Sequence, residues 1–518
     1  MMFQLVLINQ IQQTYDFLIT MSNHAATHVE KKDLFGHPRG LATLFMTEMW
    51  ERFSYYGMRA LLVLFMIAAI EDGGLALSDQ NATAIYGLYT AAVFLGSLPG
   101  GWIADRLMGA QRAVWVGGII IMAGHFILAI PSDVIFFLGL IVIVFGTGLL
   151  KPNITAIVGD LYEQDDPRRD SGFTIFYMGI NLGAALGPLV CGWLALQNWH
   201  YGFAAAGFGM LFGLIQFHLT RHHLGSAGRE PDPTVNQSDR FRRYAWTTIT
   251  ACIVLVAYLF IAGVMGWIRY DAILLAQGAT YVIVTVAAAY FLYIFAFSGL
   301  TDSERRKMAL IFVLISAATV FWVGSEQAGS SLNLFAERYT IREFGNFVIP
   351  ASWFQSANPV FIILLGPLYS MFWVALAKRH MDPSSPLKLA IGLIILGIGF
   401  IVMIGAASLV AEGQQVLPSW LIFTYLLMTM GELALSPVGM SAITKLAPRR
   451  LVGQMMGVWF LSLSLGSILA GLFAGEFRSD AVNEMPSLYL QLVMMTVGAG
   501  LILMLASGYL KRLAGDSK

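Results

Sequence analysis

The sequence predicts an all-α integral membrane protein with fourteen spanning helices in the order six, two, six. Apolar residues make up 57% of the 518-residue chain and charged residues only 12%, whereas a soluble globular protein carries roughly 25% charged residues. Segments of about 20 mostly apolar residues, the length that spans a bilayer as a helix, recur along the chain. The net charge is zero, so neither nucleic acid nor an acidic surface is indicated as a partner.

The first 20 residues fit neither a signal peptide nor a spanning helix, because they lack a basic start and are interrupted by polar residues. Two interpretations stay open for them. They form an interfacial helix, or translation begins at Met21, where MSNHAATHVEKK resembles an ordinary polar tail.

Fourteen later segments have the length and apolar character of spanning helices. The first six are 41–70, 83–107, 113–130, 134–159, 171–196 and 201–221. The other eight are 243–265, 272–298, 307–336, 349–377, 387–410, 418–444, 451–474 and 486–511. Prolines in SLPGG, ALGPL, SANPV, LLGPL and LALSPVG are expected to interrupt helices, either to line a cavity or as ordinary packing kinks.

A charged stretch rich in Gly and Pro, HHLGSAGREPDPTVNQSDRFRR, separates the sixth span from the seventh and predicts the main boundary. The expected division is an N-terminal tail (1–40), a six-helix bundle (41–221), a linker (222–242), an extra two-helix hairpin (243–298), a second six-helix bundle (299–511) and a C-terminal tail (512–518).

The basic residues predict which side each loop occupies, because Lys and Arg are retained in cytoplasmic loops. If both termini are cytoplasmic, only three of the 31 Lys and Arg residues lie within spans, and only four lie in loops on the outer side of the membrane. The other 24 are cytoplasmic. Two bundles of six joined by a cytoplasmic linker match the major facilitator pattern. GGWIADRLMGAQR resembles the loop motif of that superfamily, with Asp105, Arg106, Gly109 and Arg112 in the expected order.

Seven ionisable residues lie inside predicted spans, where each costs at least about 2.5 kcal/mol unless it faces a cavity or a partner. They are Glu48, Glu51, Arg52, Arg59, Lys151, Glu326 and Glu432. At about 100° per residue, those of the first span share one face with Tyr55 and Tyr56. They either hold helices together as buried ion pairs or handle substrate and protons. Charges from both halves favour function, because buried pairs stabilise weakly.

Two long motifs resemble those of the proton-dependent oligopeptide transporter family of the major facilitator superfamily, in its compact bacterial form. The first is Glu48-x-x-Glu51-Arg52-Phe53-x-Tyr55-Tyr56-Gly57, and the second is DPRRDSGFTIFYMGINLG, residues 166–183. GLLKPN, FWVGSEQAGSSL, GELALSP and GQMMGVWF extend the likeness through all twelve core spans. The resemblance implies a symporter that imports di- and tripeptides with protons by alternating access.

The resemblance also implies a role for each polar site residue. Arg52 and Lys151 would meet the peptide carboxylate, and Glu432 its ammonium. The complete expected peptide site consists of Arg52, Tyr55, Tyr56, Arg59, Tyr89, Lys151, Asn181, Trp322, Asn358, Glu432, Ser436 and Trp459. Its aromatic members line side-chain pockets, unless they are packing residues.

Proton coupling is expected from a set that shares members with that site, namely Glu48, Glu51, Arg52, Arg59 and Glu326. The expected gate pairs are Arg59 with Glu326 and Lys151 with Glu432. His125, in the third span, has no counterpart in the family's site, so it is either a packing residue or a proton relay.

Other function classes find less support. Cys191 and Cys252 both lie in apolar spans, which excludes a disulfide framework and metal-ligand spacing. No catalytic or nucleotide-binding motif appears, so we expect no enzyme, no metal and no cofactor beyond protons. The expected protein is a monomer in the inner (plasma) membrane. An anion or drug transporter of the same superfamily, or a non-transporting membrane sensor, remains the alternative.

Overall fold

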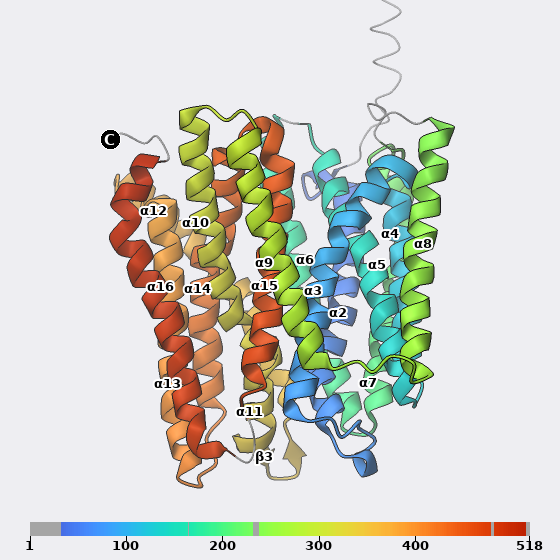
Figure 1. Ribbon diagram of the computed structural model, residues 1–518, viewed down its shortest axis with the longest axis vertical. Coiled ribbons are helices and arrows are strands. Elements are labelled where there is room, and N and C mark those ends of the chain that lie inside the picture. Colours follow the sequence, from blue (N-terminus) through green and yellow to red (C-terminus); the bar gives the residue numbers. More distant parts are fainter. Residues whose placement is uncertain (1–32, 164, 232–237, 478–480, 514–518) are drawn as a thin grey trace, which may run out of the picture.

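The structure, a computed structural model, describes residues 33–163, 165–231, 238–477 and 481–513, and it is almost entirely helical (Figure 1). Fourteen long helices run roughly parallel to one another through this part of the chain, which confirms the predicted fold class. The predictions for residues 1–32, including the start at Met21, and for 514–518 lie outside the described residues.

The first bundle follows a short ribbon of two strands, β1 (Asp33–Leu34) and β2 (His37–Pro38). Its six helices are α2 (Arg39–Ile67), α3 (Asp79–Ile103), α4 (Ala110–Leu128), α5 (Asp133–Asp160), α6 (Arg169–Ala195) and α7 (Trp199–Thr220). Short turns of 3-10 or π-helix flank them at η1 (Ile70–Asp72), η2 (Ala104–Met108) and η3 (Arg221–Leu224).

The second bundle has one irregular helix and five long ones. Its helices are α10 (Asp302–Ser325) continued by η4 (Glu326–Gly329) and α11 (Ser331–Tyr339), then α12 (Ala357–Lys378), α13 (Ser385–Ala411), α14 (Ser419–Leu446), α15 (Val452–Ala474) and α16 (Met485–Leu513). The shorter elements are β3 (Glu343–Phe344), β4 (Phe347–Val348), η5 (Ala351–Ser356), η6 (Arg449–Leu451) and η7 (Val482–Glu484).

Thirteen of the helices are long and apolar enough to cross a membrane, counting α10, η4 and α11 as one. The fourteenth is α2, which is equally long but carries charged residues in its middle. Because fourteen helices alternate in direction, α2 begins at the same end of the molecule at which α16 finishes (Figure 1). We call this the linker end, and the opposite end, which carries the β3 and β4 ribbon, the ribbon end.

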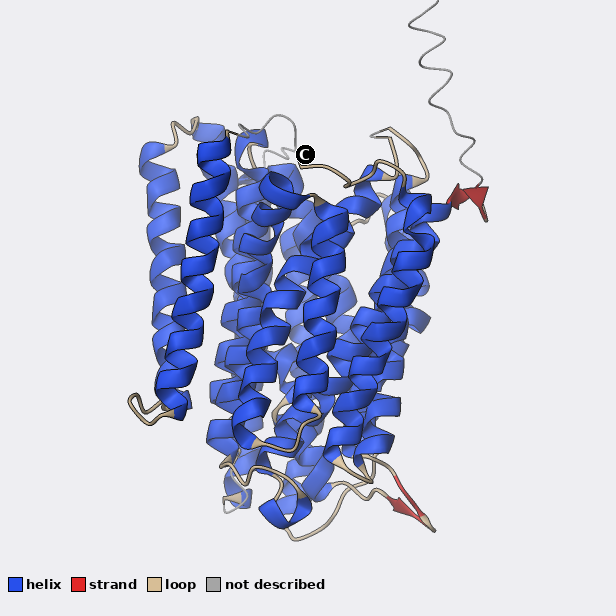
Figure 2. Ribbon diagram, turned by 90° about the vertical axis from the view of Figure 1, so that its right-hand side faces the viewer, coloured by secondary structure: helices blue, strands red, loops and turns tan. Residues whose placement is uncertain are grey.

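The helices α8 (Asp239–Val264) and α9 (Ala272–Phe297) form the predicted extra hairpin. Figure 2 shows this pair standing at one side of the two bundles. Two residues of α9, Ala276 and Ile283, join a small apolar cluster with residues of α3 and α15. The helix α8 contacts α3 through the rings of Phe241 and Trp102. Nearly all of α8 is exposed, with Ala245 and Ala262 as its buried residues. The hairpin therefore lies outside the core of twelve.

The two bundles are joined by polar contacts that gather towards the ribbon end. Asn333 of α11 donates to the carbonyl of Ala60 at 3.0 Å, and Arg338 forms a two-point ion pair with Asp79 at 2.7 and 2.8 Å. Further bonds run from Ser356 to the carbonyl of Ala185 and from Trp353 to that of Leu189. These contacts hold the ribbon end closed.

The span predicted at 307–336 is confirmed as one stretch, Asp302–Tyr339, but its helix is interrupted. The α10 helix ends at Ser325, and the chain passes through a 3-10 turn before α11. Polar side chains satisfy the backbone at the break. Ser330 donates to the carbonyl of Glu326 at 3.1 Å, and Gln327 donates to those of Val323 and Ala470. An irregular backbone at membrane depth is tolerated only with such partners.

Most of the prolines lie within continuous helices. Pro99, Pro188, Pro367 and Pro437 each lie inside a helix that continues on both sides, and Pro359 stands in the first turn of α12, where proline is tolerated. The prediction of a break in the helix is therefore wrong at the four internal prolines, where a packing kink stays a prediction. At SANPV the predicted span 349–377 does change, from the 3-10 turn η5 to α12, which begins at Ala357. Neighbouring helices and local adjustments can satisfy the carbonyl that a proline frees.

Candidate functional site

The polar stripe of α2 is buried inside the protein. Glu48, Glu51 and Arg52 are at most 3% exposed. Arg52 forms ion pairs with both glutamates, and its Nε lies 3.1 Å from Glu48 Oε1. The pairing is incomplete, because Glu48 Oε2, Glu51 Oε1 and Arg52 Nη2 are buried without a hydrogen-bond partner among the described residues. Such atoms can still bind a ligand or a proton.

Lys151 of α5 lies near this stripe. Its ammonium sits 4.2 Å from the ring centroid of Phe94 of α3, and it is within electrostatic range of Glu48, Glu51 and Arg52. The first bundle therefore gathers Arg52 and Lys151 in one place, as a carboxylate site requires. The contact with Phe94 was not predicted, since a phenylalanine in an apolar span carries no sequence signal.

A second ion pair crosses between the bundles. Nη2 of Arg59, in α2, pairs with Oε2 of Glu326, the first residue after α10. Both side chains are more than 90% buried. Helices from both halves thus meet at a charge pair that lies towards the closed ribbon end, where opening of that end would have to separate them.

Sequence reasoning missed Tyr86, which completes this pair. Nε of Arg59 donates to the Tyr86 hydroxyl at 2.6 Å, and that hydroxyl lies 3.5 Å from Glu326 Oε2. The Tyr86 side chain is fully buried in α3. The available signal was its position, one helical turn before Tyr89 on a face already assigned to the site.

The negative residue of the second bundle is Glu432 of α14. Its Oε2 accepts a hydrogen bond from Nδ2 of Asn358 at 3.0 Å, and the same amide also donates to Thr429. Glu432 is within electrostatic range of Glu326, of Tyr56 and of Tyr177. It therefore faces the first bundle.

Lys151 and Glu432 do not pair with each other in this conformation. Among the described residues, the interior ion pairs join Arg52 to Glu48 and Glu51, and Arg59 to Glu326. Tyr177 of α6 is 42% exposed although it lies within electrostatic range of Glu432 in the other bundle. Space therefore remains between the bundles on the side of this tyrosine.

The aromatic residues of the predicted site are mostly buried around these charges. Tyr55 contacts Tyr56 edge-on with centroids 5.2 Å apart and stacks with Tyr89 at 6.4 Å. The hydroxyls of Tyr55 and Tyr89 and Nε1 of Trp322 are buried without a partner among the described residues. The three side chains can therefore still donate hydrogen bonds.

The other predicted residues make contacts within their own helix or with neighbouring packing residues, and none of these contacts involves the buried charges. Trp459 packs on Gly439, where any side chain would collide with its ring. The Asn181 amide donates to the carbonyl of Tyr177 in its own helix at 2.9 Å, and Ser436 is partly buried next to Pro437 in α14. His125 is buried in α4, and neither ring nitrogen has a partner among the described residues. This favours packing over a relay.

The fold and the buried charges define a membrane transporter of two six-helix bundles rather than an enzyme. The model of the POT family matches residues 111–487, and the chain belongs to that family. It is 42% identical to the peptide transporter YePEPT of Yersinia enterocolitica, over 94% of this chain and 97% of the relative. It is 38% identical to a di-/tripeptide transporter of Lactococcus lactis subsp. cremoris, covering 87% and 91%.

Solved structures agree with this assignment. The peptide transporter POT in complex with sulfate superposes with a TM-score of 0.87 at 38% identity, covering 95% of this chain and 99% of the other. A POT family transporter in complex with 5-aminolevulinic acid superposes with a TM-score of 0.84 at 33% identity, covering 93% and 98%.

Proposed function

We propose that this protein imports di- and tripeptides together with protons, by alternating access between the two bundles. In this proposal the linker end and both termini are cytoplasmic, the ribbon end faces outwards, and a monomer in the inner membrane suffices. Bundles 41–221 and 299–511 move against each other, and the hairpin 243–298 lies outside the transport core. The observation that carries the proposal is the buried ion pair between Arg59 and Glu326 across the bundles.

Opposite charges on the two bundles suit a peptide with free ends. Arg52 and Lys151 provide a cationic region for the carboxylate, and a guanidinium matches a carboxylate in shape. Glu432 offers an anion on the other bundle for the ammonium, with Asn358 held against it. An anion carrier has little use for Glu432, which disfavours that alternative. Asn181, Ser436 and the aromatic residues would surround the peptide backbone and side chains.

Coupling to protons follows from competition for Arg59. A proton on Glu326 removes the charge that Arg59 pairs with, so the ribbon end can open. Glu48 and Glu51 compete in the same way for Arg52, which links proton binding to the peptide carboxylate. At the linker end, Lys151 and Glu432 would pair across the bundles only when that end closes, and a bound peptide would keep them apart.

The test is acid-driven uptake of di-alanine into proteoliposomes. A membrane potential of 100 mV supplies about 2.3 kcal/mol per charge and one pH unit about 1.4 kcal/mol, so the wild-type protein should concentrate the peptide more than about a hundredfold. Glu326→Gln should keep peptide exchange without a gradient and lose accumulation. Glu337→Gln is the matched control, because Glu337 pairs with Arg342 on the exposed ribbon end.

Undiminished accumulation by the Glu326→Gln variant would remove Glu326 from coupling. Binding of di-alanine by the wild-type protein without any flux would instead favour a sensor.

A further inference from the structure

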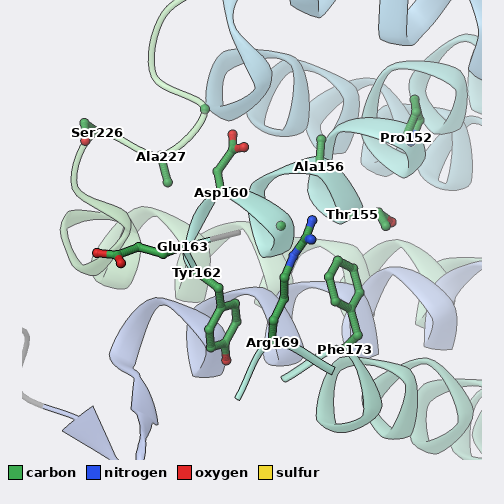
Figure 3. Close-up of a pocket in the computed structure, with 12 residues that line it drawn as sticks. Pro152, Thr155, Ala156, Asp160, Tyr162, Glu163, Arg169, Phe173, Ser226 and Ala227 are labelled. Carbon is green, nitrogen blue, oxygen red and sulfur yellow. The ribbon is translucent and has the colours of Figure 1, made fainter. Parts of the chain in front are cut away.

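A pocket of about 780 Å³ opens at the linker end of the first bundle, away from the charges described above (Figure 3). Three segments line it: the last turns of α5, the first turns of α6, and the linker at residues 226–228. Its charged side chains are Asp160, Glu163 and Arg169. The pocket thus offers both signs of charge within one concave surface.

Arg169 has the free bonding capacity that a binding residue needs. Its guanidinium carbon lies 5.9 Å from the centroid of Phe173, and its Nε is buried without a hydrogen-bond partner among the described residues. Figure 3 shows the side chain extending into the pocket beside Phe173, towards the part of α5 that carries Asp160. Asp160 is within electrostatic range of it.

The neighbouring Arg168 provides a contrast. Its guanidinium donates to Asp166 and to Asp33, and also to the carbonyl of Gly36. These bonds tie the start of α6 to the β1 and β2 ribbon. The guanidinium of Arg168 is therefore occupied by these structural hydrogen bonds, whereas the side chain of Arg169 points into the pocket.

Two helices connect the pocket to the proposed peptide site. Side chains four residues apart share one face of a helix, so Asn181, Tyr177, Phe173 and Arg169 form one stripe of α6. The stripe spans about 18 Å, at 1.5 Å per residue. On α5, Lys151, Thr155 and Gly159 follow one another in the same way. Both stripes run from the charged interior to the linker end.

We propose that this pocket is an exit site, which holds the peptide after it leaves the central charges and before it reaches the cytoplasm. Arg169 would bind the peptide carboxylate and Asp160 the ammonium, with Phe173 against the side chains. This inference rests on the proposed function, and it adds a second binding step on the linker side alone.

Gly159 gives the pocket its room. A Cβ at this position would lie 3.6 Å from Arg169 Nη2 and 3.8 Å from Phe173, which is ordinary contact without a clash. A leucine there would fill the pocket while leaving the charges unchanged. Arg169→Gln and Gly159→Leu therefore perturb the same site by different means.

The experiment measures uptake of labelled di-alanine, without a proton gradient, into vesicles of known orientation. Right-side-out vesicles present the ribbon end to the peptide, and inside-out vesicles present the linker end. Arg169→Gln should raise the half-saturating concentration at the linker end by at least about fivefold, as expected for losing one charge-assisted contact. Gly159→Leu should raise it by a similar factor, because the leucine side chain would occupy the space that the peptide needs. The value at the ribbon end should stay within about twofold. Arg168→Gln, the matched control, should change neither.

Equal effects at both ends, or no effect of Arg169→Gln at either end, would overturn the exit site while leaving the transport function intact. The thermal unfolding temperature shows whether each variant is folded. If only one of the two variants is folded, an effect of that variant at the linker end alone decides for the exit site. A wild-type protein that moves no di-alanine in either orientation would instead contradict the proposed function itself.

Discussion

Tyr86→Phe tests whether the closed ribbon end depends on the hydroxyl that joins Arg59 and Glu326. The substitution removes one oxygen from a fully buried side chain and leaves the ring in place. Arg59 Nε then loses the partner that now lies at 2.6 Å. Because the site is buried, no water replaces that bond without rearrangement.

The magnitude follows from the charge on Arg59. A hydrogen bond to a charged group contributes about 1.5–3 kcal/mol, and a buried donor left without a partner costs a similar amount. Since about 1.4 kcal/mol corresponds to a factor of ten in an equilibrium, the ratio of closed to open ribbon ends should fall about 10- to 100-fold. The ribbon end should open at a higher pH than in the wild-type protein, because fewer Glu326 side chains need a proton.

The assay is a distance measurement between two spin labels at the ribbon end. Ile70 of the first bundle and Phe344 of the second are both exposed there and suit labelling after substitution by cysteine. Cys252 is exposed and must first be replaced, whereas Cys191 is buried. A pH titration of the two distance populations then reports how far the ribbon end opens.

Tyr89→Phe is the matched control, because it removes the same atom from the same helix and its hydroxyl has no partner among the described residues. In a Glu326→Gln background, where the ion pair with Arg59 is already broken, Tyr86→Phe should change the ratio of closed to open ribbon ends very little. The reasoning is refuted if Tyr86→Phe leaves the distance populations unchanged, or if Tyr89→Phe shifts them equally.

Three further substitutions test other parts of the site. Asp79→Asn breaks the two-point ion pair with Arg338. Because that pair is partly exposed, the ratio of closed to open ribbon ends should fall by less than about tenfold. The double variant Asp79→Arg with Arg338→Asp should restore the wild-type ratio. Gly329→Ala places a Cβ against the Tyr86 hydroxyl and should open the ribbon end as Tyr86→Phe does. Distance populations equal to those of the wild-type protein would contradict the close packing of Gly329 on Tyr86. Glu432→Gln should raise the half-saturating concentration of di-alanine about tenfold or more and leave that of N-acetylated di-alanine unchanged, as uptake competition can show; equal losses would contradict an ammonium site.

Much of this fold could be predicted because membrane helices can be recognised in a sequence by their length and apolar composition. The span expected at 243–265 is α8, Asp239–Val264, and the span at 387–410 is α13, Ser385–Ala411. The charges of the site were equally visible, since an ionisable residue in an apolar span has few structural uses.

The partners of those charges could not be predicted, because they depend on contacts between distant helices. Tyr86 and Phe94 are aromatic residues in an apolar helix, a pattern that packing explains equally well. The break at Glu326 was hidden for a related reason. Its neighbours in GSEQAGSS are small and polar residues of a motif that the resemblance assigns to the site, and the bonds of Gln327 and Ser330 that sustain the break appear only in three dimensions.

The position of Glu326 in the chain suits the role proposed for it. It directly follows Ser325, the last residue of α10, and the carbonyl end of a helix carries partial negative charge. The guanidinium of Arg59 faces the carboxylate there and opposes that partial charge. In the proposed mechanism, opening the ribbon end would separate Arg59 from Glu326 and a proton would neutralise Glu326, so either event would break the same pair. Because the chain is already irregular at Glu326–Gly329, we propose that the bundle bends there.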